Sequence, residues 1–158
     1  MKPTDFKLKK GAGEAPKGNL NLKHVHGLRS HDVRNAVQYC NNGVIVFPAS
    51  KLAVVQNTIN ANKQKFFAMH DEEIVCVAVH PDKRTIATGS ISRKNDEENP
   101  LNFVDIFVWD CESLNCHAHL KGFHRNSIVS MKFSPNGSKL LTFGQDDFNS
   151  VAIYDWRN

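Results

Sequence analysis

One short segment gathers residue types that could bind a metal ion. Cys111 and Cys116 are followed by His117 and His119, and thiolates and imidazoles are ligands that Zn²⁺ prefers in proteins. The usual zinc motif, however, places its paired histidines farther along the chain, and strand alternation puts Cys116 and His117 on opposite faces. We therefore expect no metal here, and a metal-dependent enzyme built around residues 111–124 is the least favoured of three functional hypotheses.

Other motifs with chemical potential have simpler interpretations. Gly11-Ala-Gly13 follows no strand and precedes Pro16, which argues against a phosphate-binding loop. Asn136-Gly-Ser138 has the form of a glycosylation acceptor, but without a secretory signal it is better interpreted as a turn. Sequence separation supports no Ser/His/Asp or paired-carboxylate arrangement. We expect a protein that is not an enzyme and that uses no cofactor.

The excess positive charge is confined to the N-terminus. The formal net charge is +4, and residues 1–24 hold six lysines against Asp5 and Glu14, while the other residues carry equal numbers of basic and acidic side chains. A basic arm on a neutral body suits an acidic polymer or surface, although a solvated tail that keeps the protein soluble is the simpler alternative. The candidate contact residues in this arm are Lys2, Lys7, Lys9, Lys10 and Lys17.

The sequence lacks the signals of a membrane or secreted protein. No apolar run approaches the roughly 18 residues of a membrane span, and the first 24 residues have no stretch that could act as a signal peptide. We therefore expect a cytoplasmic protein that contacts neither membrane nor nucleic acid. Its four cysteines, Cys40, Cys76, Cys111 and Cys116, are expected to be reduced thiols, with Cys76 packed as a small apolar side chain.

A short β-rich run that ends in Asp or Asn occurs three times along the chain. The three final residues are Asn57, Asp110 and Asp155, which lie 53 and then 45 residues apart. Such spacing indicates a propeller-type repeat of roughly 40 to 45 residues with one insertion, and a closed propeller of four to eight blades needs more residues than this chain has. The sequence thus predicts an all-β, partial β-propeller.

Apolar runs and turn residues divide the chain into strands. Strands are expected at residues 44–47, 52–55, 65–69, 74–79, 85–88, 104–109, 128–133, 139–142 and 151–154, with alternation from Cys116 to Lys121 typical of a half-exposed outer strand. Residues 22–37 show neither helical nor strand periodicity. The last repeat lacks a fourth strand, so an unpaired edge is expected.

The repeat also predicts the domain organisation. Residues 1–21 are expected to be a basic tail that is disordered when unbound, and residues 22–69 to contribute to a first blade. Residues 70–121 should form a second blade with an inserted loop at 90–103. Residues 122–158 should form a third blade that is incomplete. The repeat is reinforced by Pro81 and Pro135, which lie 11 residues after His70 and His124.

These motifs resemble the echinoderm microtubule-associated protein-like family, in which a hydrophobic motif called HELP runs directly into WD-type repeats. The resemblance covers about residues 22–156. It rests on Val25–Arg29, Val33–Asn35, Tyr39, Gly43–Phe47, Gln64–His70, Ile74–Pro81, Ala87–Gly89, Trp109–Asp110, Ser113–Leu114, Phe133–Pro135 and Tyr154–Trp156. It implies that residues 22–69 are the HELP motif. Many members carry an N-terminal coiled coil, but residues 1–21 have no apolar heptads, so that oligomer is not expected here.

WD repeats also imply structural residues. Such a blade is held by a buried hydrogen-bond chain from a loop His through Ser or Thr and Asp to a strand Trp. His70, Thr88 and Trp109 match three of these positions, with the Asp obscured by the inserted loop. In the last repeat the four positions are matched by His124, Thr142, Asp146 or Asp147, and Tyr154, of which Asp147 is taken as the carboxylate.

Two functions remain in view. The resemblance implies a structural protein of the cytoplasm and cytoskeleton that binds tubulin or microtubules, and that could lie in a cilium or axoneme. Other structural proteins would complete its open sheet edge. The alternative is a generic WD scaffold that recruits a protein partner without contacting tubulin.

Overall fold

The computed structural model describes residues 18–33, 35–60, 62–92, 101 and 103–157. The tail residues 1–17 and most of the expected inserted loop, residues 93–100 and 102, lie outside them. In the described part the secondary structure consists of strands and one short 3-10 helix: β1 (Gln38–Tyr39), η1 (Asn41–Gly43), β2 (Val44–Ala49), β3 (Leu52–Asn57), β4 (Gln64–Phe67), β5 (Ile74–Val79), β6 (Thr85–Ser90), β7 (Ile106–Asp110), β8 (Cys116–Leu120), β9 (Ile128–Phe133), β10 (Leu140–Gly144) and β11 (Val151–Tyr154). The predicted all-β fold is confirmed.

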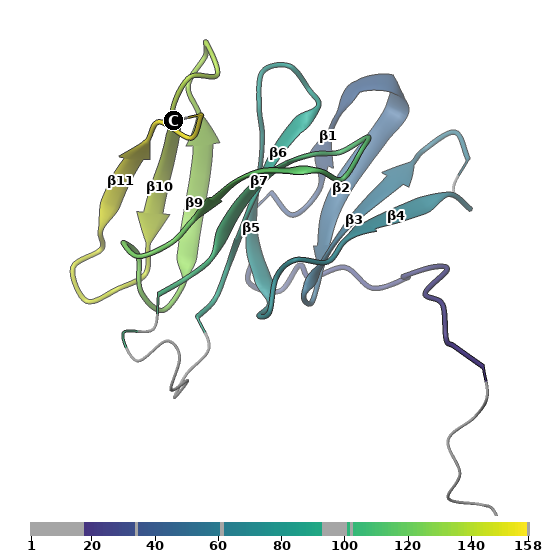
Figure 1. Cartoon of the computed structure of the whole chain (residues 1–158), viewed down its shortest axis with the longest axis horizontal. Helices are drawn as coiled ribbons and strands as arrows, with labels where there is room; N and C mark the ends of the chain where they lie inside the picture. The colour runs from purple at the N-terminus through teal and green to yellow at the C-terminus, as the bar shows by residue number, and fades with distance from the viewer. Residues whose placement is uncertain (1–17, 34, 61, 93–100, 102, 158) are drawn as a thin grey trace, which may run out of the picture.

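The strands form three antiparallel sheets that stand side by side (Figure 1). Blade 1 has the order β1-β2-β3-β4, blade 2 the order β5-β6-β7-β8, and blade 3 the order β11-β10-β9. Each sheet is a meander of consecutive strands, as in a propeller blade, and in the described residues the third blade has three strands. The structure is thus a partial propeller.

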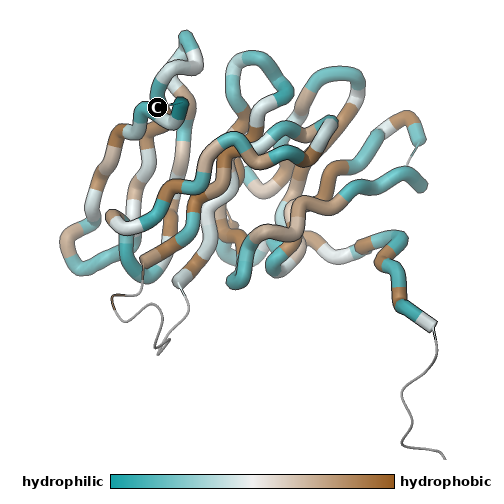
Figure 2. Tube along the Cα trace, in the orientation of Figure 1, coloured by the Kyte–Doolittle hydropathy of each residue, from teal (hydrophilic) through white to brown (hydrophobic). Residues whose placement is uncertain are grey.

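Two apolar cores join the blades. Figure 2 shows hydrophobic residues along the strands and mostly hydrophilic residues in the connecting loops. Between blades 1 and 2, Val46 and Phe67 pack against Ile86 and Trp109. Between blades 2 and 3, a second cluster consists of Cys76, Ala78, Ala87, Val104, Ile106, Val108, Ile128, Met131, Phe133, Leu140 and Trp156. Blade 2 therefore contributes alternate residues to both cores, and the three blades form one stack.

The N-terminal residues 22–33, which we call the strap, cover the outer face of blade 1. The Val25 amide donates to Gln64 Oε1 at 2.7 Å, and Gln64 Nε2 donates back to the Val25 carbonyl at 3.0 Å. Farther along, the Arg29 amide donates to the Pro48 carbonyl at 3.0 Å. Beneath the strap, Val54 on the outer face of blade 1 is completely buried. The stretch without periodicity is therefore an ordered, non-strand cover.

The outer face of blade 3 is exposed. In register across this sheet, Leu141 lies opposite Ile153, and Phe143 lies opposite Val151. Phe143, Val151 and Ile153 are 40%, 50% and 70% exposed, respectively. The outer face of blade 1 is therefore covered, whereas the outer face of blade 3 is open to solvent.

Several predicted strand bounds are corrected by the structure. The first predicted strand ends at residue 47, but β2 continues through Pro48 to Ala49. Pro48 is tolerated because β1 pairs only with Ile45 and Val46, so the missing proline N–H breaks no ladder bond on that side. Strand β4 begins at Gln64 and ends at Phe67, two residues before the predicted end. Strand β7 begins at Ile106 rather than at residue 104.

Candidate functional site: the polar chains of the blades and the interaction surface

His70, Thr88 and Trp109 meet in the core between blades 1 and 2. His70 follows β4, Thr88 lies in β6 and Trp109 in β7, and strand pairing brings Phe107 opposite Thr88, two residues before Trp109. His70 Nε2 lies 2.8 Å from the Thr88 hydroxyl, and the Trp109 indole N–H donates to the same oxygen at 3.1 Å. The threonine hydroxyl therefore ties a loop of one blade to two strands of the next.

Aromatic contacts surround this hydrogen-bond chain. The Trp109 ring stacks on Phe67 with centroids 4.4 Å apart, and His70 meets Phe107 edge to face at 4.7 Å. Burial lowers the pKa of His70 to about 4, so the imidazole is neutral at physiological pH. Its Nδ1 is buried without a hydrogen-bond partner among the described residues.

The second chain of polar groups, in blade 3, is built differently. His124 Nε2 lies 2.6 Å from the Thr142 hydroxyl, and its Nδ1 lies 2.7 Å from the hydroxyl of Ser150. The Ser150 hydroxyl in turn donates to Asp146. Burial lowers the pKa of His124, and the Ser150 hydroxyl lowers that of Asp146. A serine therefore stands between the histidine and the carboxylate.

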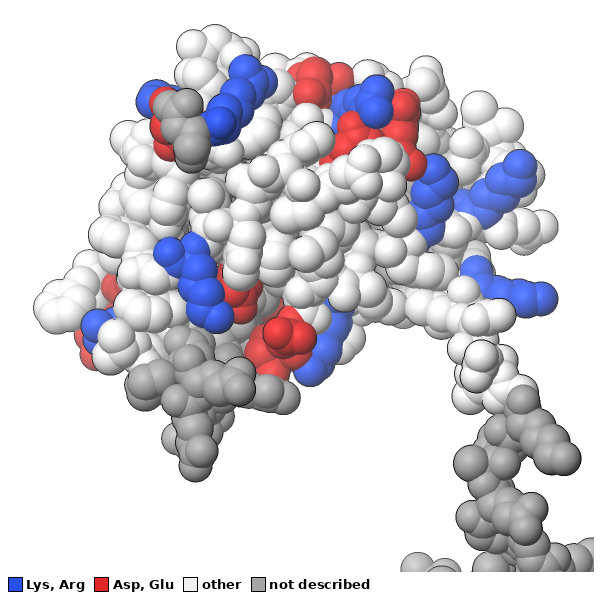
Figure 3. Space-filling view, in the orientation of Figure 1, with Lys and Arg blue, Asp and Glu red and all other residues white. Residues whose placement is uncertain are grey.

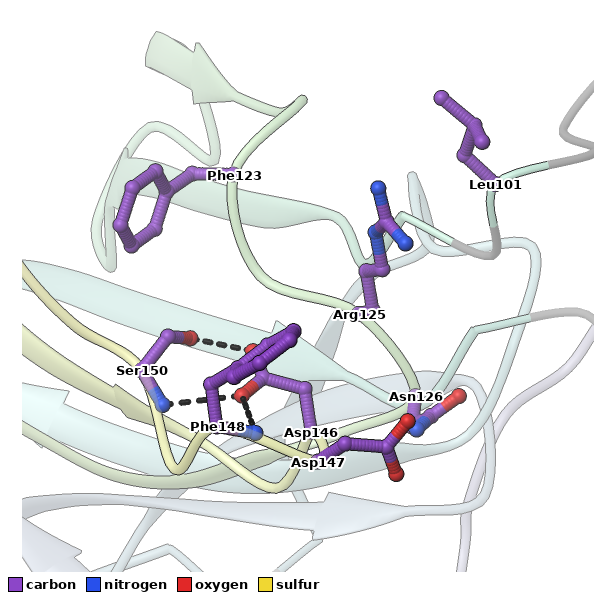
Figure 4. A pocket seen from close by; sticks show the side chains of 8 residues that line it. All are labelled: Leu101, Phe123, Arg125, Asn126, Asp146, Asp147, Phe148 and Ser150. Atoms are coloured by element: carbon purple, nitrogen blue, oxygen red, sulfur yellow. Dashed lines mark hydrogen bonds between the residues drawn. The ribbon is translucent and has the colours of Figure 1, made fainter.

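Two residues that the sequence assigned to the hydrogen-bond chain of blade 3 need correction. Asp146 rather than Asp147 supplies the carboxylate, because the turn directs Asp146 toward the Ser150 amide at 2.9 Å while the exposed Asp147 side chain points toward Asn126 (Figure 4). Tyr154 occupies the position in blade 3 that Trp109 occupies in blade 2, but its side chain packs against the apolar core. The Thr142 hydroxyl donates instead to the Ala152 carbonyl at 3.4 Å. Ser150 had no distinguishing signal in the sequence.

The cysteine and histidine side chains of residues 111–119 do not come together at one site. Cys111 is buried beside blade 1, whereas Cys116 is exposed on β8. His119 Nε2 pairs with Asp105 at 2.7 Å, and its ring stacks on Phe107. Across the described residues, no group of three or more His, Cys, Asp or Glu side chains is arranged to hold a metal ion.

Sequence reasoning missed a joint between blades 2 and 3. His80 Nε2 lies 3.2 Å from the Gly137 carbonyl, to which the Trp156 indole N–H also donates at 3.0 Å. The His80 ring meets Phe133 and Trp156 edge to face. Gly137 has a positive φ of 71°, and a Cβ there would lie 1.8 Å from His80 Nε2, so only glycine fits. The available signal was the His-Pro-Asp turn that follows β5.

An open hollow lies beside the polar chain of blade 3 and is the clearest candidate contact surface. It has a volume of about 450 Å³ and is lined by Leu101, Phe123, Arg125, Asn126, Asp146, Asp147, Phe148 and Ser150 (Figure 4). Phe123 is 50% and Phe148 is 90% exposed. Exposed aromatic rings next to an arginine and carboxylates are typical of a protein-interaction surface.

Basic side chains gather at the blade 1 end of the molecule. Lys63 and Lys65 are exposed beside Gln64, and the Val25–Gln64 pair brings exposed Lys23 to the same end. Figure 3 shows Lys and Arg at this end, whereas both signs of charge are interspersed over the rest of the visible face. The predicted contact lysines of the tail, Lys2, Lys7, Lys9, Lys10 and Lys17, lie outside the described residues. No described helix has the length and hydropathy of a membrane span.

Comparison with known proteins shows which protein families this chain resembles. Residues 15–54 match the HELP motif, and residues 61–94 match the WD domain, G-beta repeat. The chain is 29% identical over 147 residues to rat echinoderm microtubule-associated protein-like 1, an alignment that covers 91% of this chain and 18% of the relative. It is 30% identical over 146 residues to human echinoderm microtubule-associated protein-like 2, covering 90% of this chain and 22% of the relative.

Mouse echinoderm microtubule-associated protein-like 4 is 31% identical over 147 residues, covering 91% of this chain and 15% of the relative. The chain thus spans about a fifth of the length of the curated relatives that it matches. The resemblance to the echinoderm microtubule-associated protein-like family that the sequence motifs indicate is therefore confirmed, with the HELP motif and the WD repeat built into one stack of blades.

Proposed function

We propose that this protein is a non-enzymatic, microtubule-associated structural protein whose stacked blades and basic tail together bind tubulin or microtubules. The observation that carries the proposal is a HELP motif followed by a WD repeat in a chain that aligns over about nine tenths of its length with relatives named as microtubule-associated. In support of this, the HELP residues share an apolar core with the WD blade, so both belong to one folded body.

The charge distribution supports contact with an acidic polymer. Lys23, Lys63 and Lys65 form a basic end on blade 1, and the lysine-rich tail joins the described chain beside this end, at Gly18. Clustered positive charge raises the rate of encounter with an acidic surface and is screened by salt. By this proposal the protein resides in the cytoplasm on the cytoskeleton, with a cilium or axoneme as one setting.

The open edge of blade 3 supports a second partner. Strand β11 pairs with β10 on one side, and its outer side carries no strand in the described chain. An exposed strand edge is a template for pairing. We expect a strand from another structural protein, or from further residues of a longer chain, to pair with β11.

The alternative function is a WD scaffold that recruits a protein partner without touching tubulin. The hollow with exposed Phe123 and Phe148 favours it, because aromatic side chains are enriched in protein interfaces. Binding through such a buried apolar contact should change little with ionic strength, whereas tail-driven binding should weaken.

Microtubule co-sedimentation of the full chain tests the proposal. Replacing Lys7, Lys9, Lys10 and Lys17 with Gln should reduce the bound fraction at low salt without altering the melting of the folded body. A matched control replaces four exposed lysines elsewhere, Lys51, Lys83, Lys121 and Lys132, which removes the same charge. Equal binding by the tail variant and wild type would remove the tail from the mechanism. No binding by the wild type would favour the scaffold function.

A further inference from the structure

Two cysteines lie on opposite sides of the seam between blades 1 and 2. Cys40 directly precedes η1 of blade 1 and is half-buried, and Cys111 directly follows β7 of blade 2 and is 4% exposed. Both belong to the apolar core that joins these blades. They are 71 positions apart in sequence, so their proximity is a product of the blade packing.

Backbone hydrogen bonds from both cysteine segments converge on one turn of blade 2. The Asn41 amide donates to the Lys83 carbonyl at 2.8 Å, and the Cys111 amide donates to the Arg84 carbonyl at 3.1 Å. The Asn41 side chain adds a bond to the Asp82 carbonyl at 2.9 Å. The turn therefore holds the backbone on each side of the thiols in place.

The two cysteines meet in the seam, where Cys40 packs against the buried cluster that contains Cys111. The Cys40 thiol lowers the pKa of Cys111, and its interaction with Cys111, together with burial, raises the pKa of Cys40. The pair thus holds its first negative charge preferentially on the Cys111 sulfur, with the Cys40 S–H donating toward it. A thiolate beside a second thiol is the arrangement that oxidises to a disulfide.

The other two cysteines serve as internal references. Cys76 is enclosed in β5, where burial raises its pKa to about 12. Cys116 is exposed on β8, and its thiol faces the Ala118 carbonyl at 3.4 Å. The raised pKa of Cys76 disfavours its reactive thiolate, and Cys116 is open to oxidants but lies on another strand, so the four thiols should respond differently.

We propose that Cys40 and Cys111 form a disulfide under oxidising conditions and that this bond locks the HELP blade to the first WD blade. With hydrogen peroxide as the oxidant, the Cys111 thiolate attacks one peroxide oxygen, the O–O bond breaks, and the departing hydroxide takes a proton to become water. Cys40 sulfur then attacks the sulfenic sulfur of Cys111. The S–S bond forms, the S–O bond breaks, and the Cys40 proton leaves with hydroxide as a second water.

The bond would close a loop from residue 40 to residue 111. A cross-link over a loop of this length restricts the unfolded chain more than the folded one. The melting temperature of the oxidised protein should therefore rise by about 5–10 °C. The amide of Asn41 at the seam should also exchange its hydrogen more slowly.

The experiment uses the full chain with Cys116→Ser, which removes the exposed thiol and with it disulfide-linked dimers. After treatment with hydrogen peroxide, free thiols are alkylated, and the digested protein is analysed by mass spectrometry. The expected result is a peptide that joins Cys40 to Cys111 with the loss of two hydrogen atoms. It should disappear with a reductant.

The control is the double variant Cys40→Ser, Cys116→Ser, which leaves the buried Cys111 intact and should show no rise in melting temperature on oxidation. The proposal is overturned if Cys40 and Cys111 remain separately alkylated after peroxide treatment. Oxidation of Cys111 to a sulfinic acid without a cross-link would overturn it equally. A melting temperature that rises by the same amount in the control would do so as well.

Discussion

A single hydroxyl group, that of Thr88, organises the seam between blades 1 and 2 by contacting both His70 Nε2 and the Trp109 indole N–H. All three residues are buried, and Trp109 has no exposed surface. Buried polar groups are costly when they lack a partner, so the three side chains are interdependent. Changes at any one of them should affect folding before they affect binding.

Replacing Trp109 with Ala should lower the free energy of unfolding by about 3–5 kcal/mol, because the ring that stacks on Phe67 is lost and a cavity remains. Urea unfolding followed by circular dichroism measures the change. The control is Trp156→Phe at the seam between blades 2 and 3, which keeps a ring there. Normal stability of the Trp109 variant would contradict its role in joining the blades.

Acid should weaken the fold through His70. Its pKa is about 4 in the folded state, lowered by burial, against 6.5 for the free side chain. The unfolded chain therefore binds the proton more readily, and the stability contributed by this group is complete above about pH 6.5 and lost as the pH falls toward 4. The loss should reach about 3 kcal/mol.

Urea unfolding of wild type and of His70→Gln at pH 7.5 and pH 4.5 measures this loss. Wild type should lose more stability between the two pH values than the variant does. The lowered carboxyl pKa values of Asp82 and Asp110, about 2 each, place their own losses at lower pH. Equal losses in the two proteins would rule out His70 as the source.

Residue-level prediction from sequence works where the repeat fixes the position. His70, Thr88 and Trp109 could be located because the resemblance to WD repeats assigns a residue type to each of these places. The choice of Asp147 over Asp146 was wrong, since adjacent aspartates differ only in how the turn directs them. Likewise, the His80–Gly137 contact joins residues 57 positions apart and leaves no local pattern.

At the scale of elements, strands β6 and β11 have contrasting environments. Strand β6 lies between β5 and β7, whereas β11 pairs only with β10 in the described sheet. A strand at an edge leaves alternate backbone groups open to water. The stability of the two elements should differ accordingly.

Hydrogen exchange should reveal this difference. The outward-facing amides of Val151–Tyr154 should exchange quickly in the isolated chain, and those of Thr85–Ser90 slowly, because only the latter are hydrogen-bonded on both sides. Strong protection of β11 should develop in the native assembly, where we expect a further strand to pair with it. Slow exchange throughout β11 in the isolated monomer would contradict the open edge.

Element prediction follows the same logic. Ile74–Val79, Ile128–Phe133 and Val151–Tyr154 have the predicted bounds because turn residues flank apolar runs. Strand β1 has only two residues and was not predicted. Strand β2 is longer than predicted because proline is compatible with a strand where no neighbouring strand needs its N–H.

At the scale of the whole molecule, the basic tail and the neutral body should separate by their salt response. If the tail supplies the attraction, the fraction of protein that co-sediments with microtubules should fall steeply between 0.05 and 0.3 M KCl, because the Debye length shortens from about 14 to 6 Å over this range. The quadruple tail variant should show a flatter curve. Salt-independent binding of wild type would assign the attachment to apolar surface of the blades.

The order of the three blades could be predicted from the repeat, but the strap could not. Residues 22–33 have no periodicity, and their position depends on contacts such as Val25 with Gln64, 39 positions later. Likewise, the sequence does not predict that the outer face of blade 1 is covered and that of blade 3 is exposed. The difference, with Val54 buried and Ile153 exposed, depends on how the sheets and the strap assemble.

The strap has a consequence for symmetry. A stack whose two ends were both open could add copies end to end without limit and would form fibres. Among the described residues, the strap occupies the outer face of blade 1 and leaves the outer face of blade 3 open for self-association. Two copies that meet through the same face bury it mutually around a two-fold axis, and the assembly is closed. Self-association through this apolar face would therefore stop at a dimer.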